Sequence, residues 1–596
     1  MLPPRSFLGS HLTVMRHPLM RGLFVALAVA VLSLPFSLVG QASPTADLIV
    51  VNADIYTSDP SRPRASAFAI SQGRFVAVGD NADVRRLAGR GTQIIDAGGR
   101  TVTPGFIDGH SHVSGDAPRV AGVDLSYIVD KAEWLRLIEA ADRRLPKGEW
   151  LTGGYWDHTL SDGQYPSREM LDAVTPDRPV FLTHIDGHYA WVNSKALEIA
   201  GVNESSAVPP GGEIVLDAKT GKPTGILLEG AMSLVRRVIP ERDVTRRREG
   251  LAQMQAFSNS VGITGLHQMG DLADYLHLLE TARPSIRVWY GEGWSAGEGV
   301  SPDAAAKEII DLRNSVSSRV AATGKSTRVG PLLKVGYVKL MNDGVLSART
   351  AVMLDDYSDQ PGWRGEYITG PERLKAKVKA INAAGLPVAI HSIGDAAVRA
   401  SLDAFEAAGD FRPTLPNRVE HIEVVTPLDV RRFKQLGVVA SMQPNHCTNA
   451  VGYVPSRLGP RRQGDAYVWR SMLSAGVPLV FGADYPTSPL DPLTQMADAI
   501  FRTSPFGFAE GKPWFPEQAL SFEEALLAYT RTPAEMTDWA NEIGSIAPGN
   551  WADFVLLNGR VPQPMTPSFK TLKVDATYFA GREVFSSVGA RGRAPF

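Results

Sequence analysis

The sequence of 596 residues is nearly devoid of cysteine, since Cys447 is the only one. A single cysteine excludes intrachain disulfides and zinc sites built from cysteine pairs, so a bound metal must use histidine or carboxylate ligands. The chain also lacks an excess of charge of either sign, because its formal net charge is −2. Without a broad basic field, neither a nucleic acid nor an anionic membrane surface is expected as a partner.

Long apolar runs are scarce too, and the one stretch that approaches the length of a membrane span lies at the N-terminus. Basic residues that include Arg21 precede the apolar run 22–39, and the small-residue sequence GQA follows at 40–42. This order predicts a secretory signal peptide over residues 1–42, cleaved after Ala42, and a secreted or periplasmic protein with no stable membrane anchor. The alternative is an uncleaved N-terminal anchor.

The two ends of the mature chain share a β-rich style. Residues 43–103 contain short β-branched runs separated by glycine, asparagine and aspartate, and residues 540–596 repeat this pattern. Such runs are typical of antiparallel strands. Because 596 residues exceed what one hydrophobic core organises, we expect several domains, one of them a small β-sandwich built from both ends.

The middle of the chain, residues 104–539, alternates short apolar runs with longer amphipathic stretches. The runs end at or near eight polar residues: His110, His267, Glu292, Lys339, His391, His421, Gln443 and Asp484. Strands that alternate with helices predict an α/β fold, here a parallel (β/α)8 TIM barrel. Residues 114–235 interrupt the alternation after the first strand, and we expect this aromatic-rich insertion to cover the barrel end where that strand finishes.

Five of these polar positions, together with His112, suggest a metal site. His110 and His112 are two residues apart, so on one strand both side chains point to the same face. Imidazole is a common ligand of divalent zinc, nickel or iron, although an isolated pair is equally well explained by two hydrogen-bonded histidines. Because barrel strands end on one face, the pair should meet four further candidates there. These are Lys339, His391, His421 and Asp484.

Several motifs in a fixed order resemble the amidohydrolase superfamily, and specifically amidohydrolase family 3, the N-substituted formamide deformylase-like metal-dependent hydrolases. They include TPGFIDGHSH, DGHYAWVNSKAL, KLMNDGVLSARTA and VAIHSIGDAAV, and the similarity runs from about Ala46 to Phe585. The resemblance implies two divalent metal ions, with zinc expected. It places His110, His112 and Asp484 on one ion, His391 and His421 on the other, and a carbamylated Lys339 between them.

A lysine among metal ligands agrees with this resemblance. An ammonium group has no lone pair and cannot bind a metal, whereas the free amine can add carbon dioxide and form a carbamate that acts as a carboxylate. The ordinary alternative is a simple strand lysine. The resemblance further implies attack by a metal-bridging hydroxide on a C–N bond, with Asp484 as ligand and proton shuttle. His188 either holds the substrate carbonyl or is structural, and His267 is at most an outer-shell residue.

The sequence leaves the substrate open. We expect a small amide in a pocket lined by Trp156, Tyr189 and Tyr485, with a homodimer as one expectation for the assembly. Departures from the family pattern at Val345, Ser347 and Ala348, and the tyrosine at 485, put the pocket shape in doubt. The alternatives are a metal-dependent hydrolase of esters, lactones or phosphotriesters, and a non-catalytic secreted binding protein.

Overall fold

The computed structural model describes residues 45–185, 187–209, 212–294, 299–506 and 508–590. The predicted signal peptide and Asp186 lie outside the described residues. N-terminal sequencing of exported protein tests the predicted cleavage, with Ser43 as the expected first residue. Within the described ranges, none of the helices combines the length and the apolar character needed to cross a membrane.

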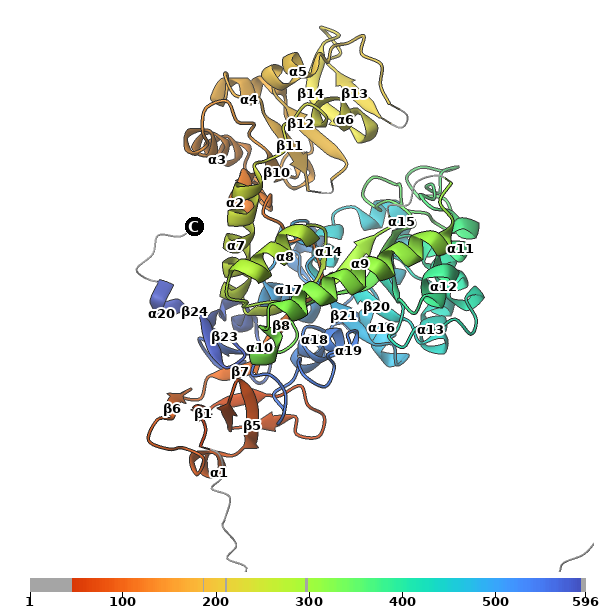
Figure 1. Ribbon diagram of the computed structural model, residues 1–596. Helices are drawn as coiled ribbons and strands as arrows, with labels where there is room; N and C mark the ends of the chain where they lie inside the picture. The colour runs from red at the N-terminus through yellow and green to blue at the C-terminus, as the bar shows by residue number, and fades with distance from the viewer. Residues whose placement is uncertain (1–44, 186, 210–211, 295–298, 507, 591–596) are drawn as a thin grey trace, which may run out of the picture. The chain divides into compact units, whose positions relative to one another are not determined.

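An eight-stranded parallel sheet forms the barrel, in the order β21-β20-β19-β18-β17-β16-β15-β8. Figure 1 labels three of its strands, β8, β20 and β21, with helices around them. The eight predicted runs are these strands: β8 (Phe106–Ser111), β15 (Ile263–Met269), β16 (Arg287–Gly293), β17 (Leu333–Met341), β18 (Val388–Ser392), β19 (Arg418–His421), β20 (Val439–Met442) and β21 (Leu479–Phe481). Most of their residues are buried, as expected for a parallel sheet covered by helices. The predicted TIM-barrel class is therefore confirmed.

Helices connect successive barrel strands. The connecting helices include α7 (Val244–Ser260), α8 (Leu272–Thr281), α9 (Pro302–Ala322), α11 (Pro371–Ala383), α12 (Asp395–Ala407), α13 (Pro427–Leu436) and α14 (Pro444–Ala450). In α13 the ends follow local chemistry: the Thr426 side chain caps the first turn, and Gly437 ends the helix at φ 67°. Only glycine adopts this left-handed conformation without steric cost, which is why the run ends there.

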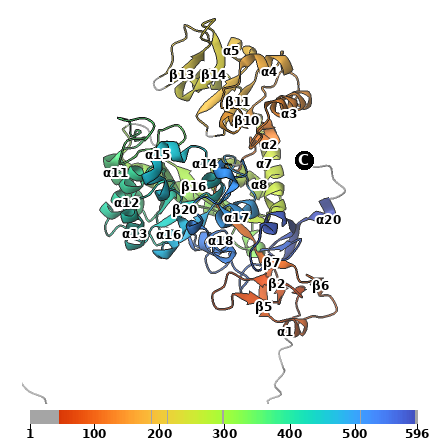
Figure 2. The same ribbon diagram turned by 180° about the vertical axis from the view of Figure 1, so that it is seen from behind.

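Two smaller sheets lie outside the barrel, and one of them joins both ends of the described chain. The first, in the order β5-β4-β1-β6, is formed by the N-terminal part alone: β1 (Leu48–Val51), β4 (Ala67–Ser71), β5 (Arg74–Gly79) and β6 (Gln93–Asp96). The second joins the C-terminal strands β24 (Arg582–Ser586), β23 (Val574–Phe579) and β22 to β7, β2 and β3 (Arg64–Ala65). In the second sheet β22 (Phe554–Leu557) pairs antiparallel with β7 (Thr101–Pro104), so residues more than 450 positions apart are neighbours. Figure 2 shows β7 beside β2 (Asp54–Tyr56), with which it pairs in parallel.

The insertion has a sheet of its own. Its six strands follow the order β13-β14-β12-β11-β10-β9. Their bounds are β9 (Val123–Asp124), β10 (Gly153–Trp156), β11 (Phe181–His184), β12 (Tyr189–Val192), β13 (Glu213–Leu216) and β14 (Pro223–Leu228). Three tryptophans, Trp134, Trp156 and Trp191, pack against one another in its core. The insertion is therefore a packed unit and not an extended loop.

Candidate metal centre

The first and last barrel strands meet at the residues predicted to bind metal. The backbone N–H of Asp484 donates to the carbonyl of His110 at 2.7 Å. Beneath them the buried Asp108 carboxylate accepts the N–H of His110 at 3.0 Å and that of Ala483 at 2.9 Å. One aspartate thus fixes both ligand-bearing segments, which places their side chains over the same end of the barrel.

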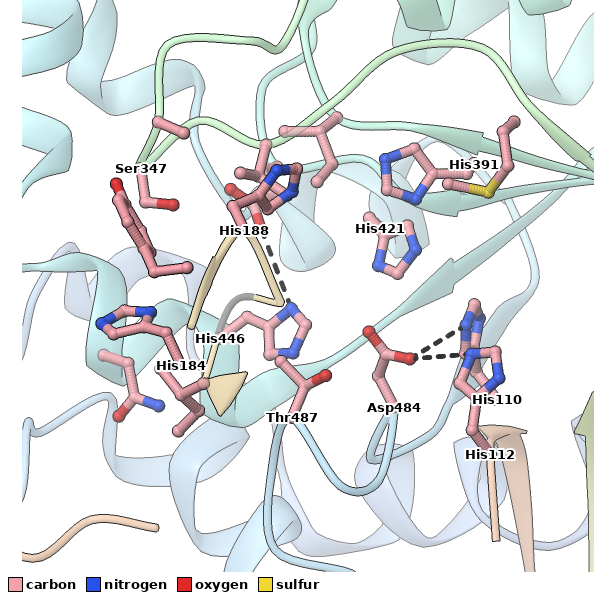
Figure 3. Close-up of a pocket in the computed structure, with 18 of the residues that line it drawn as sticks. His110, His112, His184, His188, Ser347, His391, His421, His446, Asp484 and Thr487 are labelled. Atoms are coloured by element: carbon pink, nitrogen blue, oxygen red, sulfur yellow. Dashed lines mark ion pairs between the residues drawn. The ribbon is translucent and has the colours of Figure 1, made fainter. Parts of the chain in front are cut away.

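The donor atoms of the predicted ligands converge there (Figure 3). Asp484 Oδ1 lies 3.2 Å from His110 Nε2 and 3.3 Å from His112 Nε2. One donor atom each from His110, His421 and Asp484 lies within 4.8 Å of the others, a spacing that could hold a metal ion. Burial alone would raise the pKa of Asp484, but the imidazoles of His110 and His112 outweigh it and hold the pKa well below its ordinary value.

Lys339 joins the same group. Its Nζ lies 3.4 Å from Nε2 of His110, and the group is partly buried. Burial lowers the pKa of the Lys339 ammonium to about 8, because desolvation disfavours the charged form. The neutral amine, the form that reacts with carbon dioxide, is therefore far more populated near neutral pH than for an exposed lysine.

The two remaining histidines lie side by side, with the ring centroids of His391 and His421 4.4 Å apart. His421 Nδ1 contacts the Gln443 side-chain oxygen at 2.9 Å, and His391 Nε2 lies 3.1 Å from the Gly344 carbonyl. Each acceptor holds the N–H of one ring nitrogen, so the lone pair of the other is left to bind a metal. The ring nitrogen available at His421 is Nε2, and at His391 it is Nδ1.

Glu420 is a site residue that the sequence analysis missed. The carboxylate is fully buried, accepts from His110 Nδ1 at 2.6 Å, and pairs with Arg418 at 2.5 Å. Burial would raise the pKa of Glu420, but Arg418 and His110 outweigh it and hold the pKa below its ordinary value. Glu420 lies on the same strand face as Arg418, two residues earlier, and the next residue, His421, departs from the extended strand with φ 74°.

His267 was expected to lie outside the metal ligands, at most as a supporting residue. Its Nδ1 atom lies 2.8 Å from a guanidinium nitrogen of Arg418, the residue that pairs with Glu420.

Glu420→Gln is expected to weaken zinc binding by about 10–100-fold, because the charged acceptor that orients His110 is lost. The dissociation constant is measured by competition with a chelator. Glu423→Gln is the matched control, since Glu423 is also buried and lines the cavity but pairs with His446. Equal zinc affinity in the two variants would contradict the role of Glu420.

Two of the predicted ligands occupy strained backbone positions. His421 has φ 74° and Asp484 has φ 55°, in the left-handed region that residues other than glycine rarely adopt. Each such position costs on the order of 1–3 kcal/mol and persists only where the surrounding structure enforces it. The strain at both ligands, and not at His391, favours a functional reason for their placement.

A cavity of about 1170 Å³ opens over these residues. The barrel contributes the predicted ligands, and the insertion contributes residues that include His188 and Tyr189. The His188 ring contacts the Glu229 carboxylate at 3.0 Å. The structure thus brings the predicted pocket residue Tyr189 and the predicted catalytic residue His188 to the wall of the same cavity.

Two residues predicted to line the pocket do not. Trp156 is fully buried in the core of the insertion, because the alternation along β10 turns it inward, and its indole N–H donates to the Leu182 carbonyl at 3.0 Å. The side chain of Tyr485 is 5 % exposed and packs in the main core of the barrel. Neither Tyr485 nor Trp156 lines the cavity. The break in the strand–helix alternation predicted the insertion, but its aromatic composition could not say which side chains face the cavity.

Comparison with known proteins decides the family. The sequence model of the Amidohydrolase family matches residues 93–585. The chain belongs to the amidohydrolase family. The membership in amidohydrolase family 3 that the motifs predicted is confirmed, and with it the dependence of the family on metal.

Similar proteins span nearly the whole chain. Protein LONG AFTER FAR-RED 3 of Arabidopsis thaliana is 32 % identical over 566 residues, which cover 92 % of this chain and 93 % of the relative. N-substituted formamide deformylase of Arthrobacter pascens is 29 % identical over 554 residues, which cover 90 % of this chain and 97 % of the relative. An uncharacterized metal-dependent hydrolase from Pyrococcus horikoshii has a similar structure, with a TM-score of 0.66 and 27 % identity over 86 % of this chain and 97 % of that one.

Proposed function

We propose that this amidohydrolase is an exported binuclear enzyme that hydrolyses an amide-type C–N bond. The observation that carries the proposal is the convergence of six potential ligands at one barrel end, with outer-shell partners that orient the imidazoles. The residues that would hold the two divalent ions, zinc being expected, are His110, His112, Lys339 as its carbamate, His391, His421 and Asp484. The donor set of imidazole and carboxylate groups suits zinc.

When bound, two such ions would lower the pKa of a shared water and polarise the substrate carbonyl. The chain itself would move the proton. Asp484 turns Oδ1 to His110 and His112, while its other oxygen points away from them into the cavity (Figure 3). From there it can accept the proton of the attacking water and deliver it to the leaving nitrogen. His188, on the insertion side of the cavity, is the residue that we propose holds the substrate.

The cavity wall favours a substrate with an apolar substituent. Tyr165, Tyr189 and Trp294 all line it, and aromatic side chains offer flat apolar contact surface. We therefore propose an aromatic N-formyl or N-acyl amine as the first substrate class, in keeping with the name of the Arthrobacter pascens relative. The second proposed class is an N-acyl amino acid. Two arginines that line the cavity, Arg349 and Arg457, share a single carboxylate, that of Asp359, which leaves a positive charge for the carboxylate of such a substrate.

A paired substrate panel tests the function. N-formyl, N-acyl and N-acyl amino acid amides are assayed beside esters of matched shape, with purified full-length mature protein and its metal content measured by elemental analysis. We expect two divalent ions per chain and hydrolysis of at least one amide class. Turnover of esters or phosphotriesters alone would replace the amidase by the alternative reaction. Less than half an ion per chain, with no activity after adding zinc, manganese or cobalt, would refute the binuclear centre.

A further inference from the structure

The insertion carries a second cluster of potential metal ligands, separate from the barrel centre. Asp157 follows β10 directly, His158 is the first residue of the 3₁₀ helix η1 (His158–Leu160), and His184 ends β11. Strands β10 and β11 pair in parallel with Trp156 opposite His184, so the three residues meet at one edge of the insertion sheet. One donor atom from each lies within 4.8 Å of the others.

The spacing of the three donor atoms suits a shared metal ion. His158 Nδ1 lies 3.3 Å and Asp157 Oδ1 lies 3.6 Å from the same atom, His184 Nε2. Zinc–nitrogen bonds of about 2.0–2.1 Å in a tetrahedron put neighbouring ligand atoms roughly 3.3 Å apart.

The surroundings keep the His184 ring in place. It is 4 % exposed and packs edge-on against Trp156 at 4.7 Å and Tyr189 at 4.8 Å. A ring held in this way keeps its Nε2 atom beside Asp157 and His158.

Asp157 also has a structural role, because its Oδ1 accepts the backbone N–H of Thr159 at 2.8 Å and its hydroxyl at 2.7 Å. That role accounts for the carboxylate at the start of η1. The two imidazoles come from separate places in the fold, His158 from η1 and His184 from the end of β11. Both bonds from Thr159 end on Oδ1, so Oδ2 accepts neither of them.

We propose that Asp157, His158 and His184 bind an additional divalent ion of the zinc class. Two imidazoles and one carboxylate suit zinc, cobalt or nickel better than magnesium or calcium, which prefer oxygen ligands. All three residues line the cavity that the barrel ligands also line, so the remaining coordination position faces the substrate space. Figure 3 shows His184 across the cavity from His110 and His112. An ion there would bind a Lewis-basic group at the end of the substrate remote from the reacting bond.

Cobalt titration of the metal-free full-length protein tests the site, with bound metal measured by elemental analysis and by the visible absorption of low-coordinate cobalt. Two variants remove ligands: His158→Ala, and Asp157→Asn, which keeps an oxygen for Thr159 while removing the charge. His277→Ala is the matched control, since His277 is also partly buried and belongs to neither cluster. We expect the two ligand variants to bind one equivalent less than the wild type and the control. Equal stoichiometry in all four proteins would overturn the proposal.

A second titration separates this site from the barrel centre. The double variant His110→Ala/His421→Ala removes two histidines of the barrel centre, while the insertion cluster is untouched. We expect this protein to retain one cobalt equivalent with a low-coordinate spectrum, and to lose it when His158→Ala is added. Retention of that equivalent after His158→Ala, or no binding at all in the folded double variant, would overturn the insertion site. Because the readout is metal binding, it does not depend on whether the barrel proves to be an amidase.

Discussion

Asp484→Asn is expected to lower kcat on amides by a factor on the order of 100 or more, while substrate binding changes little. An amide has a poor leaving group, so its nitrogen must be protonated as the C–N bond breaks. Among the six predicted ligands, Asp484 is the one with an oxygen turned from its imidazole partners into the cavity. The amide of asparagine keeps the shape but cannot accept and return a proton. Steady-state kcat and KM measure the loss, with metal content checked in the same samples.

The leaving group distinguishes proton transfer from a general electrostatic effect. The loss should be much smaller on an activated ester of matched shape, whose leaving group needs no protonation. Glu292→Gln is the control, because Glu292 is another partly buried carboxylate on the cavity wall, at the end of β16. We expect it to affect kcat far less. A variant at Asp484 that stays near wild type on amides while keeping its metal would refute the proton-shuttle role.

Lys339→Ala is expected to cost the protein one of the two proposed metal ions and most of its activity. Replacing a residue that only orients a metal ligand typically lowers metal affinity or activity by roughly 10–100-fold. We expect a larger decrease when the bridging carbamate itself is lost. The Lys339 amine lies 3.4 Å from His110 Nε2, and burial lowers its pKa to about 8. Elemental analysis measures the metal, and hydrolysis of the best amide substrate measures the activity. Acetate in the buffer should restore part of both, because a carboxylate fits the vacated space.

Lys334→Ala is the matched control for this experiment. Lys334 lies on the same strand, β17, but is paired with Asp538 far from the ligands. We expect this variant to keep both ions and its activity. Unchanged metal content in Lys339→Ala would show that Lys339 is not a ligand, and a loss that acetate cannot restore would favour an ordinary structural lysine.

The ends of the barrel strands could be predicted because they are local patterns. Each buried parallel strand is a short apolar run, and a polar residue such as His391 or Lys339 marks where the run meets the open face. The closed parallel sheet then brings all strand ends together whatever their separation along the chain. This is why candidate ligands could be proposed from the sequence, and the family, which the comparisons confirm, could be predicted from motifs that include the same residues.

The orientation of single side chains was decided by the tertiary structure alone. Glu420 contacts His110 across 310 positions of sequence, and the positive φ of His421 breaks the regular alternation of its strand. Trp156 is turned into the insertion core while its neighbour His158 faces the cavity. A sequence pattern records which residues are apolar and how they repeat. It holds no record of which buried polar groups pair at long range, because that depends on how separate elements pack and on which hydrogen bonds remain to be satisfied.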